Sequence, residues 1–386
     1  MRRQERFEFY EFFAGGGMAR LGLGAGWRST FANDFSPKKG RAYRENFPPA
    51  REFRSGDVGE IPASDLPGHA TLAWASFPCQ DLSLAGNREG LKGRRSGTFW
   101  PFWELMQGLA REHREPPMIV LENVVGAITS TGGADFRGLC DTLAGGGYWF
   151  GPMIIDAVHF LPQSRPRLFI VAVSHDMQPP ESLTLDRPMD LWHPEALREA
   201  KALLPERLAR DWIWWQLPAP PQRVTTLEDL IEETPSGVPW HHEEQTARLL
   251  SLMTDCNLKK VEDAKRAGRR RVGTVYRRTR PDGHGGKSQR AEVRFDGISG
   301  CLRTPAGGSS RQTVLVVEGE LVRSRLLTPR EAARLMGLPD DYALPANYNE
   351  AYHLLGDGLA VPAVRWLAKC LLTPLALAQR GARRAA

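Results

Sequence analysis

Residues 8–18 read EFYEFFAGGGM, and this segment sets the architecture of the chain. The apolar run at 8–13 predicts a buried strand, and Gly15, Gly16 and Gly17 then turn the backbone into a helix. Glycines let a backbone approach a ligand closely, and a helix N-terminus offers unpaired N–H groups. The pattern is typical of nucleotide-binding βαβ units, although a simple tight turn explains a glycine-rich loop equally well.

Further short apolar runs follow within the first 173 residues, separated by segments with helix-like spacing such as 17–24 and 99–111. Strands that alternate with helices predict an α/β fold with a doubly wound, mainly parallel sheet. Such sheets bind ligands at the carboxyl ends of their strands, so we expect the functional residues there. The predicted strands lie at 71–76, 118–121, 153–158 and 168–173.

The composition is that of an ordinary globular protein, with 386 residues, 41% hydrophobic and 25% charged. This length predicts two domains with a large core, and the composition excludes disordered, collagenous and coiled-coil proteins. The net charge is only +6, but residues 259–290 hold 12 Lys/Arg against 3 Asp/Glu, which is +9. The basic character is therefore local, and the remainder of the chain is acidic by about three charges.

The five cysteines form no CxxC pair and no zinc-binding spacing, which predicts free thiols in a reducing compartment and no metal. The N-terminal residues lack the apolar core of a signal peptide. No run of 18 consecutive apolar residues occurs, so we expect no membrane span and a soluble, cytoplasmic protein.

The pattern changes between residues 174 and 325, where Pro, Trp and Arg are frequent and periodicity is weak. From residue 326 it is helical again, and Thr328 followed by Pro329 predicts a helix start. We therefore expect a discontinuous domain of residues 1–173 and 326–386, with 174–325 as an inserted domain. The tryptophan cluster at 212–215 is expected in the core of the inserted domain.

Reactive side chains follow three of the predicted strands. Cys79 lies in a proline turn after the strand at 71–76, a position that favours a nucleophile over a small buried hydrophobe. Glu122 follows the strand at 118–121, where it is either a proton donor or a solvated acid. Arg165 and Arg167 precede the strand at 168–173, where they either face an anion or carbonyl or form a charged turn.

Two acidic residues complete the pattern of the glycine loop. Asp34 stands 19 residues after Gly15, about where an acid accepts hydrogen bonds from a ribose, and Asp57 follows a possible third strand. The loop at 86–97 is glycine-rich and cationic, which suits closure over an anionic substrate. None of these features by itself distinguishes S-adenosylmethionine from a nicotinamide dinucleotide.

Six short motifs follow one another along the chain. They are FxGGG (13–17), PCQ (78–80), ENV (122–124), QxRxR (163–167), TPREAARLMGLP (328–339) and GDGLAVP (356–362). This ordered set resembles the cytosine-C5 DNA methyltransferases of bacterial or phage type. The resemblance implies a Rossmann-like, S-adenosylmethionine-dependent catalytic domain, with a target recognition domain in residues 174–325. It also implies double-stranded DNA as the partner, with the target cytosine flipped out of the duplex.

The resemblance also implies a mechanism. The Cys79 thiolate would attack carbon 6 of cytosine, after which carbon 5 takes the methyl group of S-adenosyl-L-methionine. Glu122 would protonate or hydrogen-bond ring nitrogen 3. Arg165 would hold the pyrimidine carbonyl, with Arg167 in support.

The remaining site residues are carried over motif by motif, and two of them depart from the family's pattern. Met18 stands where the family usually has glycine, and Asp357 replaces the usual asparagine, which puts the contacts near the cofactor in doubt. The expected cofactor contacts are Phe13, Gly15, Gly17, Asp34, Phe35, Asp57, Pro78 and Asp357. The expected DNA contacts are Gln80, Ser83, Arg94, Arg95, Arg277, Arg278, Arg280, Arg303 and Arg311.

Other functions remain open at this point. The nearest is an RNA (tRNA) cytosine-5 methyltransferase built on the same catalytic set, although a recognition segment of this length favours duplex DNA. A catalytically silent DNA-binding relative and a nicotinamide oxidoreductase are weaker alternatives, because Cys79, Glu122 and Arg165 are all present. We also expect a monomer on DNA, nucleoid-associated in the cytoplasm, with a cognate restriction endonuclease as a possible partner.

Overall fold

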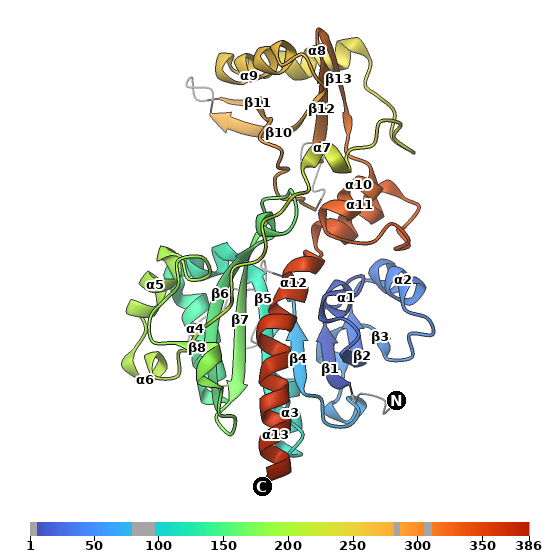
Figure 1. Cartoon of the computed structure of the whole chain (residues 1–386). Helices are drawn as coiled ribbons and strands as arrows, with labels where there is room; N and C mark the ends of the chain where they lie inside the picture. The colour runs from blue at the N-terminus through green and yellow to red at the C-terminus, as the bar shows by residue number, and fades with distance from the viewer. Residues whose placement is uncertain (1–5, 79–96, 282–285, 305–310, 386) are drawn as a thin grey trace. The chain divides into compact units, whose positions relative to one another are not determined.

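The computed structural model describes residues 6–78, 97–281, 286–304 and 311–385 (Figure 1). The chain forms two compact units. The first consists of Met1–Asp156, Pro166–Pro220 and Ala363–Ala386, and the second of Ala157–Arg165 and Pro221–Pro362. Residues 174–220 thus pack with the first unit and 326–362 with the second, which differs from the division expected at 174–325. The assignment of target recognition to that segment stays a prediction.

The first unit is built on a seven-stranded sheet with the order β3-β2-β1-β4-β5-β7-β6. The pairs joining β3, β2, β1, β4 and β5 are all parallel, whereas β7 runs antiparallel to both β5 and β6. The prediction of a mainly parallel α/β sheet is therefore confirmed. The strands are β1 (Phe7–Phe12), β2 (Trp27–Asp34), β3 (Phe53–Ser55), β4 (Leu72–Ala75), β5 (Met118–Val124), β6 (Tyr148–Asp156) and β7 (Pro166–Ser174).

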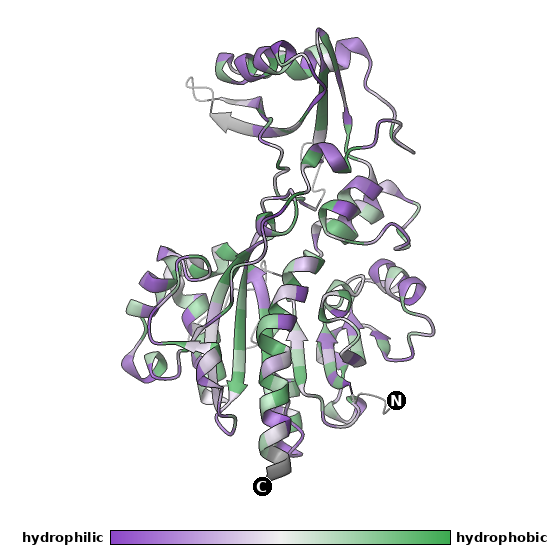
Figure 2. Ribbon diagram, in the orientation of Figure 1, coloured by the Kyte–Doolittle hydropathy of each residue, from purple (hydrophilic) through white to green (hydrophobic). Residues whose placement is uncertain are grey.

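Both faces of this sheet are buried, which explains the long apolar runs of strands such as β6 and β7 (Figure 2). On one face, β1 residues such as Tyr10 and Phe12 join a core with α3 and α4. On the other, Trp27 packs against Phe7 and donates to the hydroxyl of Thr373 in α13. The helices of this unit are α1 (Met18–Leu23), α2 (Pro37–Asn46), α3 (Phe99–Arg111), α4 (Ala134–Gly145), α5 (Glu195–Ala202), α6 (Glu206–Ala209) and α13 (Thr373–Ala385).

The tryptophan cluster belongs to the first unit, which corrects the expectation that it forms the core of an inserted domain. Trp212 and Trp214 join the core of α3 and α4, and Trp212 packs edge-on against Phe136 and Phe150. Trp215 donates its indole N–H to the carbonyl of Val171 in β7. The cluster is built on the edge strand β6 and on the small ladder of β8 (Thr184–Leu185) and β9 (Trp214–Trp215).

The second unit is built on a four-stranded antiparallel sheet with the order β11-β10-β12-β13. Apolar side chains of three strands, including Val275, Val293 and Leu315, pack against Leu249 and Val261 of two helices. Thr328 caps α10 with Pro329 in the first turn, which confirms the predicted helix start. The elements are α7 (Leu227–Leu230), α8 (Glu243–Ser251), α9 (Asp255–Arg266), β10 (Arg271–Pro281), β11 (Lys287–Arg294), β12 (Thr313–Glu318), β13 (Leu321–Leu326), α10 (Pro329–Leu335) and α11 (Tyr348–Gly356).

α12 (Val361–Leu367) belongs to a helical run, Tyr348–Ala382, that is long and apolar enough to cross a membrane by length and composition alone. Of its most apolar window, 61% is buried inside the protein, as in a core helix. The expectation that the chain has no membrane span stays a prediction. Within the described ranges, no cluster of three His, Cys, Asp or Glu side chains forms that could hold a metal ion.

Candidate active site

The carboxyl ends of β1, β2, β4 and β5 gather the polar residues expected there. β4 leads through the buried Phe77 to the exposed Pro78, where the described segment ends. The nucleophile expected at Cys79 and the expected DNA contacts Gln80, Ser83, Arg94 and Arg95 lie outside the described residues, as does most of the loop at 86–97. The site is therefore described below from the residues at the ends of β1, β2 and β5.

The glycine loop follows β1 directly and takes up left-handed backbone conformations. Phe13, Gly15 and Gly17 have φ values of 57°, 56° and 77°. A Cβ on Gly17 would lie 2.3 Å from the ring of Phe47, so the loop packs closely on its outer side. A Cβ on Gly15 would meet no atom within 4 Å, so the loop backbone there faces open space. Met18, one of the two departures, begins α1 with its side chain buried.

Asp34 and Phe35 end β2 beside this loop. The Asp34 carboxylate accepts the N–H groups of Gly15 and Ser36, both at 2.8 Å, and so fixes the loop against the strand. A carboxylate has about four acceptor positions, so roughly two remain for hydroxyl donors. The ring of Phe35 is 72% exposed, an unusual position for a large apolar side chain, and it provides a flat surface for stacking.

The remaining two expected cofactor acids lie on exposed turns. Asp57 caps the short helix Val58–Glu60 by accepting the N–H of Gly59 at 2.8 Å. Asp357 belongs to the second unit, where its carboxylate accepts the hydroxyl of Thr304 at 2.8 Å. Thr304 was not singled out in the sequence, because its partner is 53 residues away.

Glu122 and Arg167 form an ion pair on the adjacent strands β5 and β7. Arg167 Nε lies 3.3 Å from Glu122 Oε1, and the two side chains are only 15% and 9% exposed. The antiparallel register pairs Val124 with Arg167, which places the arginine at the carboxyl end of β5. The neighbouring Asn123 donates to the carbonyl of Phe77 at 3.0 Å and so ties β5 to the segment that leads to Cys79.

Arg165 makes different contacts from Arg167, although only one residue separates them. Its side chain is 1% exposed and lies in the second unit. Its guanidinium donates to the carbonyls of Leu302 at 2.9 Å, Gly356 at 2.8 Å and Gly358 at 2.6 Å. The residue thus holds together two loops of its own unit, one of which contains Asp357. This placement favours a positioning role over the expected direct contact with a pyrimidine carbonyl.

The expected DNA-contacting arginines that are described lie in the second unit. Arg278 of β10 faces Arg290 of β11 in the register and lies 3.4 Å from Glu292. Arg303 is exposed, and Arg311 donates to Asn349. Arg277 precedes Arg278 on β10 and therefore points to the other face of the sheet. Arg280 lies further along β10, and its side chain is outside the described part of the chain.

Glu11 is a buried acid that sequence reasoning missed. It lies on β1 with 1% exposure, near Arg20, Glu52 and Asp34. Burial raises its pKa to about 8, which the positive charge of Arg20 only partly counteracts. Arg20 itself is paired with Glu52 and Tyr43. The available signal was an acidic residue next to the buried end of an apolar strand, where a carboxyl is cut off from water.

The comparisons with known proteins agree with this geometry. The family model described as C-5 cytosine-specific DNA methylase matches residues 7–373. The type II methyltransferase M.HpaII of Haemophilus parainfluenzae is 26% identical over 96% of this chain and 91% of its own length. M.HhaI of Haemophilus parahaemolyticus is 24% identical over 93% and 92%. The crystal structure of the S. pombe Dnmt2 methyltransferase has a TM-score of 0.59 at 18% identity, covering 96% of this chain and 99% of that one, and shares the fold.

Proposed function

Because the chain belongs to the C-5 cytosine-specific DNA methylase family, we propose that Cys79, Glu122 and Arg167 carry out its reaction. The protein is a DNA (cytosine-5)-methyltransferase that uses S-adenosyl-L-methionine, and its family forms a covalent cysteine adduct with the target base. The observation that supports these residues is the buried pair of Glu122 and Arg167 at the end of β5. Asn123 ties the same strand end to the residues that lead to Cys79.

The chemistry requires each of these groups. The Cys79 thiolate adds to carbon 6 of the flipped-out cytosine, and the displaced electron pair moves toward nitrogen 3, which takes a proton from Glu122. Carbon 5 becomes an enamine carbon and accepts the methyl group that S-adenosyl-L-methionine supplies. A water molecule takes the carbon-5 proton, and the electron pair left behind forms the 5,6 double bond and expels the thiolate. The nitrogen-3 proton returns to Glu122, which restores the aromatic ring.

Arg167 takes the contact with the pyrimidine carbonyl in this proposal. Its guanidinium lies beside the Glu122 carboxylate, and five donors in a planar fork can reach a carboxylate and a carbonyl at once. The Arg165 guanidinium donates to the carbonyls of Leu302, Gly356 and Gly358 and to the sulfur of Cys301. Its part is to position the loop that carries Asp357.

The cofactor loop fits S-adenosyl-L-methionine. Gly15 leaves open space where a side chain would otherwise project, and Asp34 keeps free acceptor positions for ribose hydroxyls. The exposed ring of Phe35 suits stacking on adenine, and Asp57 suits its amino group. Phe13, Gly17, Pro78 and Asp357 complete the proposed set, with the last two at the methyl and methionine end.

The four-stranded sheet of the second unit is proposed to contact DNA. Arg278 and Arg290 are directly opposite on neighbouring strands, and both are exposed. Glu292 supplies one negative charge against these two positive ones, so a net positive charge remains that would attract a phosphate. Arg277, Arg280, Arg303 and Arg311 are proposed as further contacts. We also propose that the protein acts as a monomer in the cytoplasm and that it belongs to a restriction–modification pair, like the type II relatives.

A duplex carrying 5-fluorocytosine tests the proposed nucleophile, because fluorine at carbon 5 blocks the final elimination. We expect a denaturation-resistant protein–DNA adduct that disappears in Cys79→Ala. Cys256→Ala is the matched control, since this thiol is exposed, and it should keep the adduct. An adduct that persists in Cys79→Ala contradicts the assignment. Labelled cofactor with duplex DNA or tRNA tests the substrate, and labelling of tRNA alone would favour the RNA alternative.

A further inference from the structure

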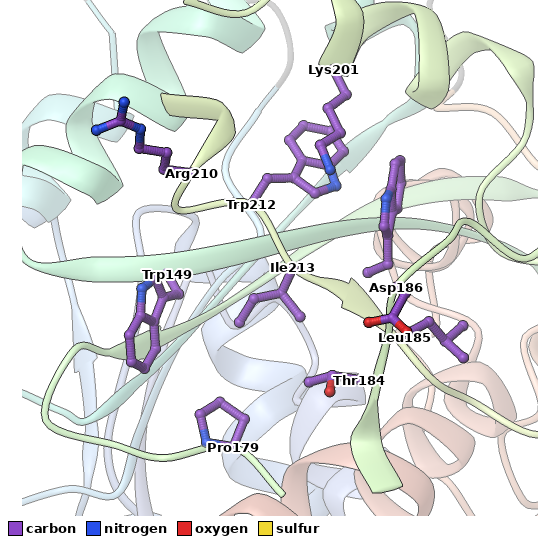
Figure 3. A pocket seen from close by; sticks show the side chains of 10 residues that line it. Trp149, Pro179, Thr184, Leu185, Asp186, Lys201, Arg210, Trp212 and Ile213 are labelled. Carbon is purple, nitrogen blue, oxygen red and sulfur yellow. The ribbon is translucent and has the colours of Figure 1, made fainter. Parts of the chain in front are cut away.

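The first unit contains a hollow of about 350 Å³, whose lining includes Trp149, Trp212 and Trp214 (Figure 3). This volume falls in the range of small-ligand sites. The three indoles come from two segments that meet at the edge of the sheet. Trp149 is on β6, and the other two belong to the segment whose backbone pairs with Phe150 at 2.9 Å.

This hollow lies near the amino ends of the strands, whereas the candidate active site lies at their carboxyl ends. β6 is antiparallel to β7, and β7 is antiparallel to β5, so β6 runs in the same direction as β5. Trp149 is the second residue of β6 and lies where the strands begin, whereas Glu122 lies near the end of β5. In the register Glu122 pairs with Phe169, which pairs with Met153, four residues along β6 from Trp149 and so roughly 13 Å along the strand. A flipped cytosine or the cofactor at the carboxyl edge therefore does not occupy it.

Lys201 is the main charge of this hollow. Its ammonium lies 4.8 Å from the ring centroid of Trp214 and 5.8 Å from that of Trp212 (Figure 3). Burial lowers its pKa, and among the described residues no carboxylate forms an ion pair with it. Arg210 adds a second cation to the lining, already paired with Glu206. A half-buried ammonium group beside aromatic rings favours a ligand with a negative charge.

Two polar features add recognition beyond charge. Thr184 and Asp186 supply a hydroxyl and a carboxylate to the same lining, and these can accept from the N–H edge of a heteroaromatic ring.

We propose that this hollow binds a planar heteroaromatic anion of the size of a nucleoside monophosphate. The ring packs against the half-buried indole of Trp149, the phosphate lies at Lys201, and the polar edge of the ring meets Thr184 and Asp186. The nucleotide is free in solution or is part of a nucleic-acid strand, since both present the same chemistry. The site is separate from the strand ends of the same unit that carry Asp34 and Glu122.

Calorimetric titration with AMP tests the proposal on the full chain, with saturating S-adenosylhomocysteine to fill the cofactor site. We expect saturable binding below about 1 mM, and adenosine without phosphate should bind about tenfold more weakly. Photolabelling with 8-azido-AMP should modify the peptides that contain Trp149 or residues 211–215. Competition by AMP alone indicates a free nucleotide, and competition by a short single strand indicates nucleic acid.

Variants separate this site from general effects. Lys201→Gln should weaken AMP binding about tenfold, while Lys201→Arg, which keeps the charge, should stay within about threefold. Lys369→Gln is the matched control, because Lys369 lies 5.8 Å from the Trp366 ring outside the hollow, and it should bind AMP normally. Absence of saturable binding, equal binding of adenosine, unchanged binding in Lys201→Gln, or labelling confined to residues 12–18 or 34–35 would each overturn the proposal.

Discussion

Replacing Arg165 by lysine keeps the positive charge but removes the planar fork that the structure uses. One guanidinium nitrogen donates to Leu302, and the other donates to Gly356 and Gly358. A lysine ammonium at 1% exposure reaches one of these loops but not both. The matched change is Arg167→Lys, two positions along the same segment, where an ammonium can still pair with the Glu122 carboxylate.

The expected magnitude follows from the bonds that are lost. Hydrogen bonds to a charged group contribute about 1.5–3 kcal/mol each, and Arg165→Lys loses two of the three to carbonyls. Small backbone shifts recover part of this loss, so we expect the free energy of unfolding to fall by about 4 kcal/mol. That is a large share of a typical stability of roughly 5–15 kcal/mol. Arg167→Lys should lose less than about 1 kcal/mol but methylate DNA about a hundredfold more slowly.

Urea unfolding followed by circular dichroism measures the stability of both variants, and transfer of labelled methyl groups to duplex DNA measures activity. Hydrogen exchange should show the amides of residues 301–304 and 355–358 losing protection in Arg165→Lys. A loss below about 1 kcal/mol in Arg165→Lys, with normal protection of both loops, would refute the positioning role. Equal destabilisation by the two variants would refute the division of labour between the arginines.

Three further outcomes are expected. The pKa of folded Glu11, about 8, is above its ordinary 4.5, so its protonated carboxyl stabilises the fold fully below about pH 4.5 and loses this contribution towards pH 8. Urea midpoints of the wild type should therefore fall over this range relative to Glu11→Gln, and parallel curves would contradict the reasoning. Phe35→Ala should weaken cofactor binding about tenfold in equilibrium dialysis with little loss of stability, since the ring is 72% exposed; unchanged affinity would count against stacking. Arg278→Ala should lower the salt dependence of duplex binding by about one unit of log–log slope, and an unchanged slope would exclude a phosphate contact.

Much of the sheet could be predicted because several of its strands are short apolar runs that can be recognised in the sequence. Parallel strands buried on both faces are continuously apolar, and the residues that follow them fall at one edge, as Asp34 and Glu122 do. The reversal of β7 against β5 could not be predicted, because strand direction depends on pairings between distant segments. The position of the tryptophan cluster could not be predicted for the same reason. Its apolar side chains indicate burial, but the unit in which they are buried depends on contacts with distant segments.

The roles of the two arginines were not predictable for a related reason. Arg165 and Arg167 stand in one short motif with the same side chain, and only contacts at a sequence distance of more than 130 residues distinguish Arg165. The carboxylate of Asp34 was expected to serve a ligand, but half of its acceptor capacity holds its own loop in place. The local sequence therefore indicated which functional groups are present, and contacts between distant segments determined what each group binds.

The C-terminal helix α13 also has a consequence for how the protein is made. Thr373 accepts the indole N–H of Trp27, and Arg380 lies 4.1 Å from the ring centroid of Phe7, so residues made late cover strands made first. During translation the ribosome releases all of residues 157–362 before this cover exists. The smaller unit can therefore fold while the nascent catalytic sheet still exposes aromatic side chains. Chaperones that bind apolar segments should engage the growing chain until α13 emerges.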